Sequence, residues 1–129
     1  MGQALSRSEA REVAYRIVFA GGTVEEVLPV ALGDKFAPAP ELNFIQHVVQ
    51  AVYDNLATID QKITANLKDW TIDRLKKTDL AALRLGIAEI MLGEVPVPVV
   101  INEAVNLAKK YGDAQSGSFV NGVLAKLVA

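Results

Sequence analysis

Residues 95–128 read VPVPVVINEAVNLAKKYGDAQSGSFVNGVLAKLV, and this stretch decides the fold. The alternating valines and prolines of residues 95–98 predict an extended segment that delays the start of a helix. An apolar face at helical spacing follows, formed by Ile101, Ala104, Val105, Ala108 and Tyr111. Gly112 predicts the end of this helix, behind two lysines that suit the negative end of its dipole.

A last helix is predicted after the polar residues 113–118. Its apolar residues form a double stripe, namely Phe119, Val120, Val123, Leu124, Leu127 and Val128. Two neighbouring helices with wide apolar faces and a short loop between them predict an antiparallel pair. We therefore expect this pair at the centre of a helical domain, with Phe119 in its core.

Helix starts upstream are marked by capping-box patterns, in which Ser or Thr is followed three residues later by Glu or Gln. The pattern occurs at Ser6, Thr23 and Thr58. Pro29 predicts a short or kinked second helix. A long helix is expected from Glu41, then a fourth one with Ile59, Ile63, Leu67 and Trp70 on its inner face, then one that Thr78 caps and Gly93 ends.

No stretch shows the alternation typical of a strand, so the sequence predicts an all-α protein of about seven helices. We expect one domain, residues 1–129, made of two small helical subdomains at about residues 1–57 and 58–129. With 129 residues, 51% of them apolar, the chain can build a sizeable core.

Composition excludes several functions. The chain has no cysteine, and therefore no disulfide, thiolate zinc site or cysteine nucleophile. Its net charge of −2 and pI of about 5.4 argue against nucleic-acid binding through overall charge alone. No apolar run is as long as a membrane span, and the first residues lack the apolar core of a signal peptide. A cytoplasmic protein is expected.

Catalytic motifs are lacking. His47 is the one histidine, and no neighbouring serine or carboxylate pattern places it in a triad. Neither a P-loop nor a dinucleotide-binding glycine motif occurs. Asp69 and Asp73 are more simply part of a solvated face than metal ligands. The sequence therefore predicts a non-enzymatic protein without a metal or cofactor.

Arginines of the first predicted helix are the candidates for binding. Arg7 and Arg11 are four residues apart and share one helix face, and Arg16 follows on the same helix. Guanidinium groups bind phosphates in a forked geometry and stack on unpaired bases. The alternative from the residues alone is a solvated face paired with Glu9 and Glu12.

Three separated motifs give the chain a resemblance to a known family. They are V-x-x-NEA-x-x-LAKK-[YF]-G at residues 99–112, FVNGVL at 119–124, and LRL-x-x-x-E from Leu83 to Glu89. Together they resemble the C-terminal signature of the NusB family. That resemblance implies a small all-helical transcription antitermination factor. Such a protein would bind single-stranded boxA RNA together with the ribosomal protein NusE, and would support the elongation complex, chiefly on ribosomal RNA operons.

The resemblance also implies site residues. Family members carry an arginine-rich N-terminus of the form RRxAREfA that contacts RNA, and residues 7–14 match it, with Ser8 and Glu9 where many members have basic residues. Phe19 stands where a tyrosine is frequent, Ser118 where a lysine is common, and Ala125 where some members have an aspartate. The implied RNA-binding residues are Arg7, Arg11, Arg16, Phe19, Ser118 and Asn121. Glu89 is expected to face NusE.

Other functions remain open at the level of sequence. The related N-terminal domain of ribosomal RNA cytosine methyltransferases would fit the resemblance, although no methyltransferase domain follows before Ala129. A helical protein–protein docking module without RNA contact would fit the acidic pI and the thinned arginine run. Some NusB-family members form homodimers, and the sequence leaves a homodimer open.

Overall fold

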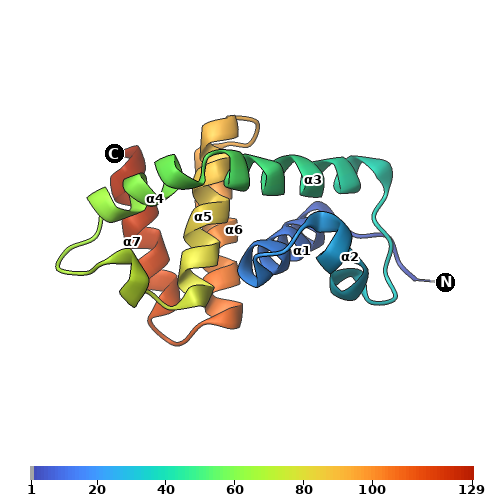
Figure 1. The fold of residues 1–129 in the computed structure, drawn as a ribbon, viewed down its shortest axis with the longest axis horizontal. Helices are drawn as coiled ribbons and strands as arrows, with labels where there is room; N and C mark the ends of the chain where they lie inside the picture. The colour runs from blue at the N-terminus through green and yellow to red at the C-terminus, as the bar shows by residue number, and fades with distance from the viewer. Residues whose placement is uncertain (1) are drawn as a thin grey trace.

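Helices make up nearly all the regular structure of the computed structural model, which describes residues 2–129 (Figure 1). The α-helices are α1 (Arg7–Ala20), α2 (Val24–Leu32), α3 (Ala39–Asp54), α4 (Leu56–Ala65), α5 (Lys77–Leu92), α6 (Val97–Tyr111) and α7 (Ser116–Val128), and a 3₁₀ turn, η1 (Ile72–Arg74), precedes α5. The described residues contain no sheet, only one isolated bridge between Ala4 and Phe36. The predicted all-α class with seven helices is confirmed.

The helices form two groups that α3 joins. Figure 1 shows α1 and α2 on one side, α5, α6 and α7 on the other, and α3 running across both. Contacts agree with this view, since α3 touches both α1 and α5, while α6 packs against α5 and α7. The predicted antiparallel pair, α6 and α7, therefore lies against α5. The division into subdomains near residue 57 stays a prediction.

Local capping fixes the first two helices as the sequence predicts. The Ser6 hydroxyl accepts a hydrogen bond from the Glu9 backbone N–H at 3.1 Å, and the Glu9 carboxylate accepts one from the Ser6 N–H at 2.9 Å. Thr23 and Glu26 make the same reciprocal pair at the start of α2. These contacts satisfy backbone donors that a helix start would otherwise leave free.

Two predicted caps are wrong. Thr58 lies inside α4, which begins at Leu56, and Thr78 lies inside α5, which begins at Lys77. The side chain of Asn55 donates to the Ala51 carbonyl at 2.8 Å, so it closes α3 and the chain enters α4 without a side-chain cap. Local patterns identify residues able to cap a helix, but the turn between two packed helices decides where the second one starts.

The segment that decides the fold becomes helical earlier than predicted. Helix α6 begins at Val97 and carries Pro98 in its first turn, where the missing N–H of proline costs no hydrogen bond. Helix α7 begins at Ser116 instead of residue 119, because its first turn is buried against α6. A Cβ on Gly117 would lie 2.9 Å from the Lys109 side chain, so a larger residue there would have to displace that side chain.

The core lies where α5 meets its neighbours. A Cβ on Gly86 would lie 3.3 Å from a Leu124 methyl and 3.4 Å from the Ala104 Cβ, so α5, α6 and α7 approach closely there. Leu124 is fully buried, as predicted. Phe119, by contrast, is only partly buried, because it lies at the edge of α7 beside a surface pocket. Phe119 packs against the core from its edge, so the prediction of a fully enclosed core position is wrong, while its inward placement is confirmed.

Candidate nucleic-acid interface

Helix α1 carries the three arginines that the sequence singles out, and each has a different environment. Arg7 is half exposed, Arg11 is buried, and Arg16 is exposed. The helix is apolar and buried along the side formed by Ala10, Val13, Ala14, Ile17 and Val18. Arg11 shares that buried side, and this position removes it from solvent.

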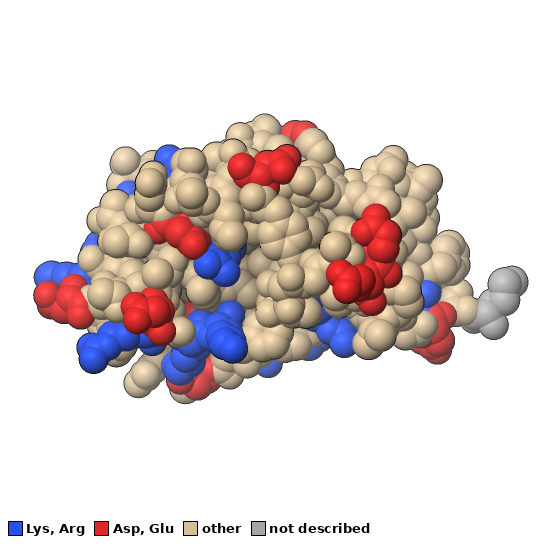
Figure 2. Space-filling model, viewed as in Figure 1, with Lys and Arg blue, Asp and Glu red and all other residues tan. Residues whose placement is uncertain are grey.

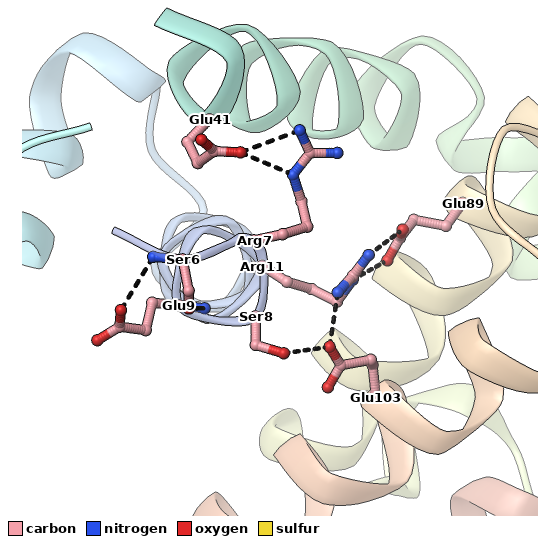
Figure 3. Close-up of polar contacts among 8 residues, drawn as sticks. All are labelled: Ser6, Arg7, Ser8, Glu9, Arg11, Glu41, Glu89 and Glu103. Carbon is pink, nitrogen blue, oxygen red and sulfur yellow. Dashed lines mark hydrogen bonds and ion pairs between the residues drawn. The ribbon is translucent and has the colours of Figure 1, made fainter. Parts of the chain in front are cut away.

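Arg11 is held by two carboxylates from distant helices (Figure 3). Its guanidinium donates to both oxygens of Glu89 on α5, at 2.6 and 3.0 Å, and to Glu103 on α6 at 2.7 Å. The guanidinium also lies 5.1 Å from the ring centre of Phe44 on α3. Desolvation alone would lower the pKa of Arg11, but its hydrogen bonds and charge attraction to Glu89 and Glu103 outweigh it and raise that pKa.

The environment of Glu89 differs from the expectation that it is a surface charge. Its side chain is 3% exposed and both of its oxygens accept hydrogen bonds from Arg11. A carboxylate buried in this way needs a paired cation to offset desolvation. Glu89 therefore serves the contact between α1 and α5 in this structure, and Arg11 is not available to solvent. Direct contacts of Arg11 with RNA and of Glu89 with NusE stay predictions.

Arg7 lies one helical turn before Arg11 and is only partly engaged. It donates to Glu41 on α3, with atoms 3.0 and 3.1 Å apart, and sits 4.6 Å from the ring centre of Phe44. Nearly half of its side chain is exposed, at 47%. An exposed ion pair of this kind is weak, so Arg7 can exchange Glu41 for a phosphate at small cost.

Glu9, which replaces a basic residue of the family pattern, is neutralised locally. The Lys35 ammonium bonds its carboxylate and, together with the Ser6 backbone N–H, lowers the pKa of Glu9 from 4.5 to about 2. The charge of Glu9 is thereby screened from any anion near Arg7.

Arg16 and Phe19 lie together at the other end of α1. They line a mostly apolar hollow of about 360 Å³ with residues of α2 and of the ends of α5 and α6. Phe19 is 48% exposed and stacks on Tyr15, with ring centres 6.5 Å apart. Tyr15 in turn lies 5.0 Å from the ring of Tyr111 on α6. A cation beside an exposed aromatic ring is the arrangement that binds unpaired nucleotides.

Ser118 and Asn121 are both exposed on α7. The Ser118 hydroxyl donates to the Gln115 carbonyl at 3.2 Å. Between them in sequence, Phe119 lines a second hollow, of about 290 Å³, together with Trp70, Arg74, Leu75, Lys76, Asp79 and Gln115. The predicted residues thus fall into two places, the hollow at Phe19 and the surface at Phe119, while Arg7 lies apart from both at the start of α1.

Sequence reasoning missed most of the hollow at Phe119. The spacing of the sequence predicts Trp70 on the inner face of the fourth helix, but α4 ends at Ala65 and Trp70 is 56% exposed. The helix ends there because the Asn66 side chain donates to the Lys62 carbonyl at 2.8 Å. The apolar residues lose their helical spacing after Leu67, and this loss was the sequence signal that the helix ends before Trp70. Lys76 at the rim bonds the carboxylate of Asp113 and ties the start of α5 to the α6–α7 loop.

Basic and acidic side chains are intermixed on the surface near this hollow. On the face drawn in Figure 2, most lysines and arginines gather at the end where the α4–α5 connection and the α6–α7 loop lie. Residues 2–129 contain no cluster of three or more histidine, aspartate or glutamate side chains suited to a metal ion. Within the same range, no helix has the length and apolar character needed to cross a membrane.

Comparison with protein families gives a match along nearly the whole chain. The model of the NusB family matches residues 6–129. The chain is 38% identical to the transcription antitermination protein NusB of Ruminiclostridium cellulolyticum, covering 98% of this chain and 88% of that protein. It is also 38% identical to the protein of that name from Oceanobacillus iheyensis, over 97% of this chain and 100% of the relative.

Solved structures of NusB proteins also match nearly the whole chain. NusB of T. maritima superposes with a TM-score of 0.86 at 27% identity, covering 97% of this chain and 92% of that one. A second match has a TM-score of 0.83 and 31% identity, covering 94% of each chain. That structure is described as antitermination factors NusB and NusE in complex with double-stranded RNA.

Proposed function

The chain belongs to the NusB family, and from that premise we propose that it is an RNA-binding transcription antitermination factor. The observation that carries the proposal is the match, over 94% of both chains, to a structure containing NusB, NusE and RNA. The role is non-enzymatic, in agreement with relatives that carry the name of antitermination proteins. It would be exercised in the bacterial cytoplasm, where RNA polymerase elongates transcripts.

The ligand is single-stranded boxA RNA, bound together with NusE. Net charge supports a need for the partner, since a chain of −2 attracts a polyanion weakly. A basic partner bound beside the RNA adds phosphate contacts and raises affinity through joint binding. The pair then acts on the elongation complex, chiefly on ribosomal RNA operons.

Exposed residues on α1 and α7 are our candidates for the RNA contact. Arg16 and Phe19 offer a cation and an exposed ring side by side, and Ser118 and Asn121 are free of burial on α7. Arg7 lies nine residues before Arg16, about 14 Å along the helix, and would contact a different phosphate. We assign Arg11 an indirect role, because its side chain fixes α1 against α5 and α6.

One observation favours a second candidate function, a docking module without RNA contact. Arg11 is fully engaged by Glu89 and Glu103, and Arg7 is paired with Glu41, which leaves few free cations on α1. In that case NusE would supply the RNA contacts and this chain would only hold NusE in place.

Fluorescence anisotropy with labelled boxA RNA tests the proposal. Titrations use this protein alone, NusE alone and an equimolar mixture, with a scrambled RNA of equal length as control. We expect weak binding by this protein alone and markedly tighter, boxA-dependent binding by the mixture. If the mixture binds no better than NusE alone, the RNA-binding role is wrong and the docking function is favoured.

A further inference from the structure

Two arginines of α1 lie against the same aromatic ring of α3 but have different partners. The guanidinium carbon of Arg7 lies 4.6 Å from the ring centre of Phe44, and that of Arg11 lies 5.1 Å from it. Arg11 is buried and bonded to two carboxylates, whereas Arg7 is 47% exposed and, within residues 2–129, forms an ion pair with Glu41 alone. Of the two, Arg7 can therefore change its partner without breaking the contact between helices.

The Glu41 carboxylate occupies an edge of the Arg7 guanidinium that suits a phosphate. One carboxylate oxygen, Oε2, accepts a hydrogen bond from Nε at 3.1 Å and lies 3.0 Å from Nη2. Figure 3 shows this contact reaching from the start of α1 to α3. Arginine binds carboxylates and phosphates through the same pair of N–H groups. An RNA phosphate on this edge must therefore replace Glu41.

Glu41 has other donors nearby when it leaves Arg7. It lies in the first turn of α3, to which the described residues supply no side-chain cap. The backbone N–H groups of a first helical turn have no partner within the helix, and the helix dipole favours a negative charge there. The released carboxylate is therefore stabilised at the start of its own helix, and the exchange costs little.

Phe44 keeps the Arg7 guanidinium in place during this exchange. It follows Glu41 by three residues on the same face of α3, and its partly buried ring packs against the core. The face of an aromatic ring attracts a guanidinium cation. Because Arg11 is fixed by its two carboxylates and contacts the same ring, this ring is a rigid surface for Arg7. The orientation of Arg7 is thereby kept when Glu41 leaves.

Charge at the start of α1 indicates what Glu41 does to RNA binding. Two arginines meet three carboxylates there, so the group has an excess of one negative charge; its members are Arg7, Arg11, Glu41, Glu89 and Glu103. A negative charge close to Arg7 repels an approaching phosphate. Without the charge of Glu41 the group would be neutral, and Arg7 would have no competing carboxylate.

We propose that Glu41 is an internal competitor of RNA, with its carboxylate in the position of a phosphate on Arg7 and with Phe44 positioning the guanidinium for the exchange. The inference rests on the proposed RNA-binding function and describes its regulation. Arg7 contributes to RNA binding only when a phosphate displaces Glu41. By weakening the RNA contact of this chain, Glu41 makes binding depend more strongly on joint binding with NusE.

A double-mutant cycle measured by fluorescence anisotropy tests this competition. The four proteins are wild type, Glu41→Gln, Arg7→Ala and the double variant, each bound to NusE and titrated with labelled boxA RNA. Glu41→Gln should tighten RNA binding by about two- to fivefold, the ratio that corresponds to an exposed ion pair. In the Arg7→Ala background the same change should leave the affinity nearly unchanged, because it then releases no guanidinium.

Glu94→Gln is the matched control for overall charge. Glu94 lines a hollow of about 150 Å³ that Arg7 also lines, but its own partner is His47. The change removes one carboxylate near Arg7 without releasing its guanidinium. It should alter RNA affinity less than Glu41→Gln does, and by the same factor with and without Arg7→Ala.

The role of Phe44 needs its own variants. Phe44→Leu removes the ring but keeps an apolar side chain, and it should weaken RNA binding by about two- to fivefold, as expected for one exposed cation–π contact. Phe44→Tyr keeps the ring and should restore the affinity. Circular dichroism and NusE binding without RNA should be the same for both variants and wild type. An RNA affinity of Phe44→Leu equal to that of wild type would overturn the positioning role.

The outcomes distinguish the competition from the wider function. If Glu41→Gln tightens binding equally with and without Arg7, it acts through overall charge and the proposal is wrong. If Arg7→Ala leaves the affinity for boxA RNA unchanged in both backgrounds, the proposal is wrong while the RNA-binding function stands. If the complex binds boxA RNA no better than NusE alone, both are wrong. Weaker NusE binding by Glu41→Gln without RNA would show that Glu41 pairs with the protein partner, which also overturns the proposal.

Discussion

Arg11 and Glu89 are 78 residues apart in sequence and make two parallel hydrogen bonds, at 2.6 and 3.0 Å, inside the protein. The forked guanidinium matches the carboxylate in a geometry that a lysine could not reproduce. Glu103 adds a third bond, so one side chain of α1 joins α5 and α6. The contact fixes how the N-terminal helix lies on the C-terminal helices.

Glu89→Ala should therefore destabilise the protein strongly. The change removes two of the three hydrogen bonds of the buried Arg11 guanidinium and leaves Glu103 as its only carboxylate partner. Breaking a buried ion pair costs about 3–5 kcal/mol, and the remaining bond to Glu103 places the expected loss toward the lower end of that range. Urea unfolding followed by circular dichroism measures this loss. Arg7→Ala is the matched control, because its pair with Glu41 is half exposed and contributes less than about 1 kcal/mol. Equal losses from the two variants would contradict the buried role of Glu89.

Local features of the fold were predictable because the residues that create them are neighbours in sequence. Ser6 and Glu9 form a capping box three residues apart, and Gly93 ends α5 in the left-handed conformation, with φ of 69°. The family was predictable for a related reason, since each of the three NusB-like motifs is a short continuous run of residues. Thr58 failed as a cap because the adjoining helix, α3, decides where α4 begins.

The candidate site was less predictable because it depends on distant contacts. The sequence singled out Arg11 and Glu89 separately and assigned them different ligands, although they bind each other. Nothing near Asp79 in sequence indicates that it is buried with an unpaired oxygen, and Trp70 has the spacing of a core residue. Which helices meet, and at what depth, is set by tertiary packing.

Lys35→Ala should return the pKa of Glu9 toward 4.5, because the hydrogen bond from Lys35 is the main cause of its lowering to about 2. A carboxylate with a lowered folded pKa stabilises the protein above its unfolded pKa. That contribution is lost as the pH falls from about 4.5 to about 2. NMR titration of the Glu9 side chain measures the shift in both proteins. A Glu9 pKa that is the same in wild type and variant would rule out the pairing.

Leu124→Ala should cost more stability than Phe119→Ala, although phenylalanine is the larger residue. Leu124 is fully buried beside Gly86, so its removal leaves a cavity and costs about 2–5 kcal/mol. Phe119 lines an open hollow, and water can occupy the space it leaves. Thermal unfolding of the two variants gives the comparison. A larger loss of stability for Phe119→Ala than for Leu124→Ala would show that the Phe119 ring belongs to the core, and would contradict this account.

Arg16→Ala should weaken RNA binding by the complex with NusE without unfolding the protein, because Arg16 is exposed. Loss of one phosphate contact on a single strand reduces the slope of log affinity against log salt by about 0.7. Anisotropy titrations at several salt concentrations measure this slope. Lys62→Ala, a charge removal on α4, is the control. If the Arg16→Ala and Lys62→Ala variants show the same slope of log affinity against log salt, Arg16 makes no phosphate contact.

Transcription through a terminator tests the central claim most directly. The measurement is single-round transcription with RNA polymerase on a template that places boxA upstream of a terminator, with and without this protein and NusE. We predict that the two proteins together raise the fraction of transcripts reading past the terminator, and that a scrambled boxA removes the increase. Readthrough that is unchanged by adding this protein to NusE, or equal on boxA and scrambled templates, would contradict the account.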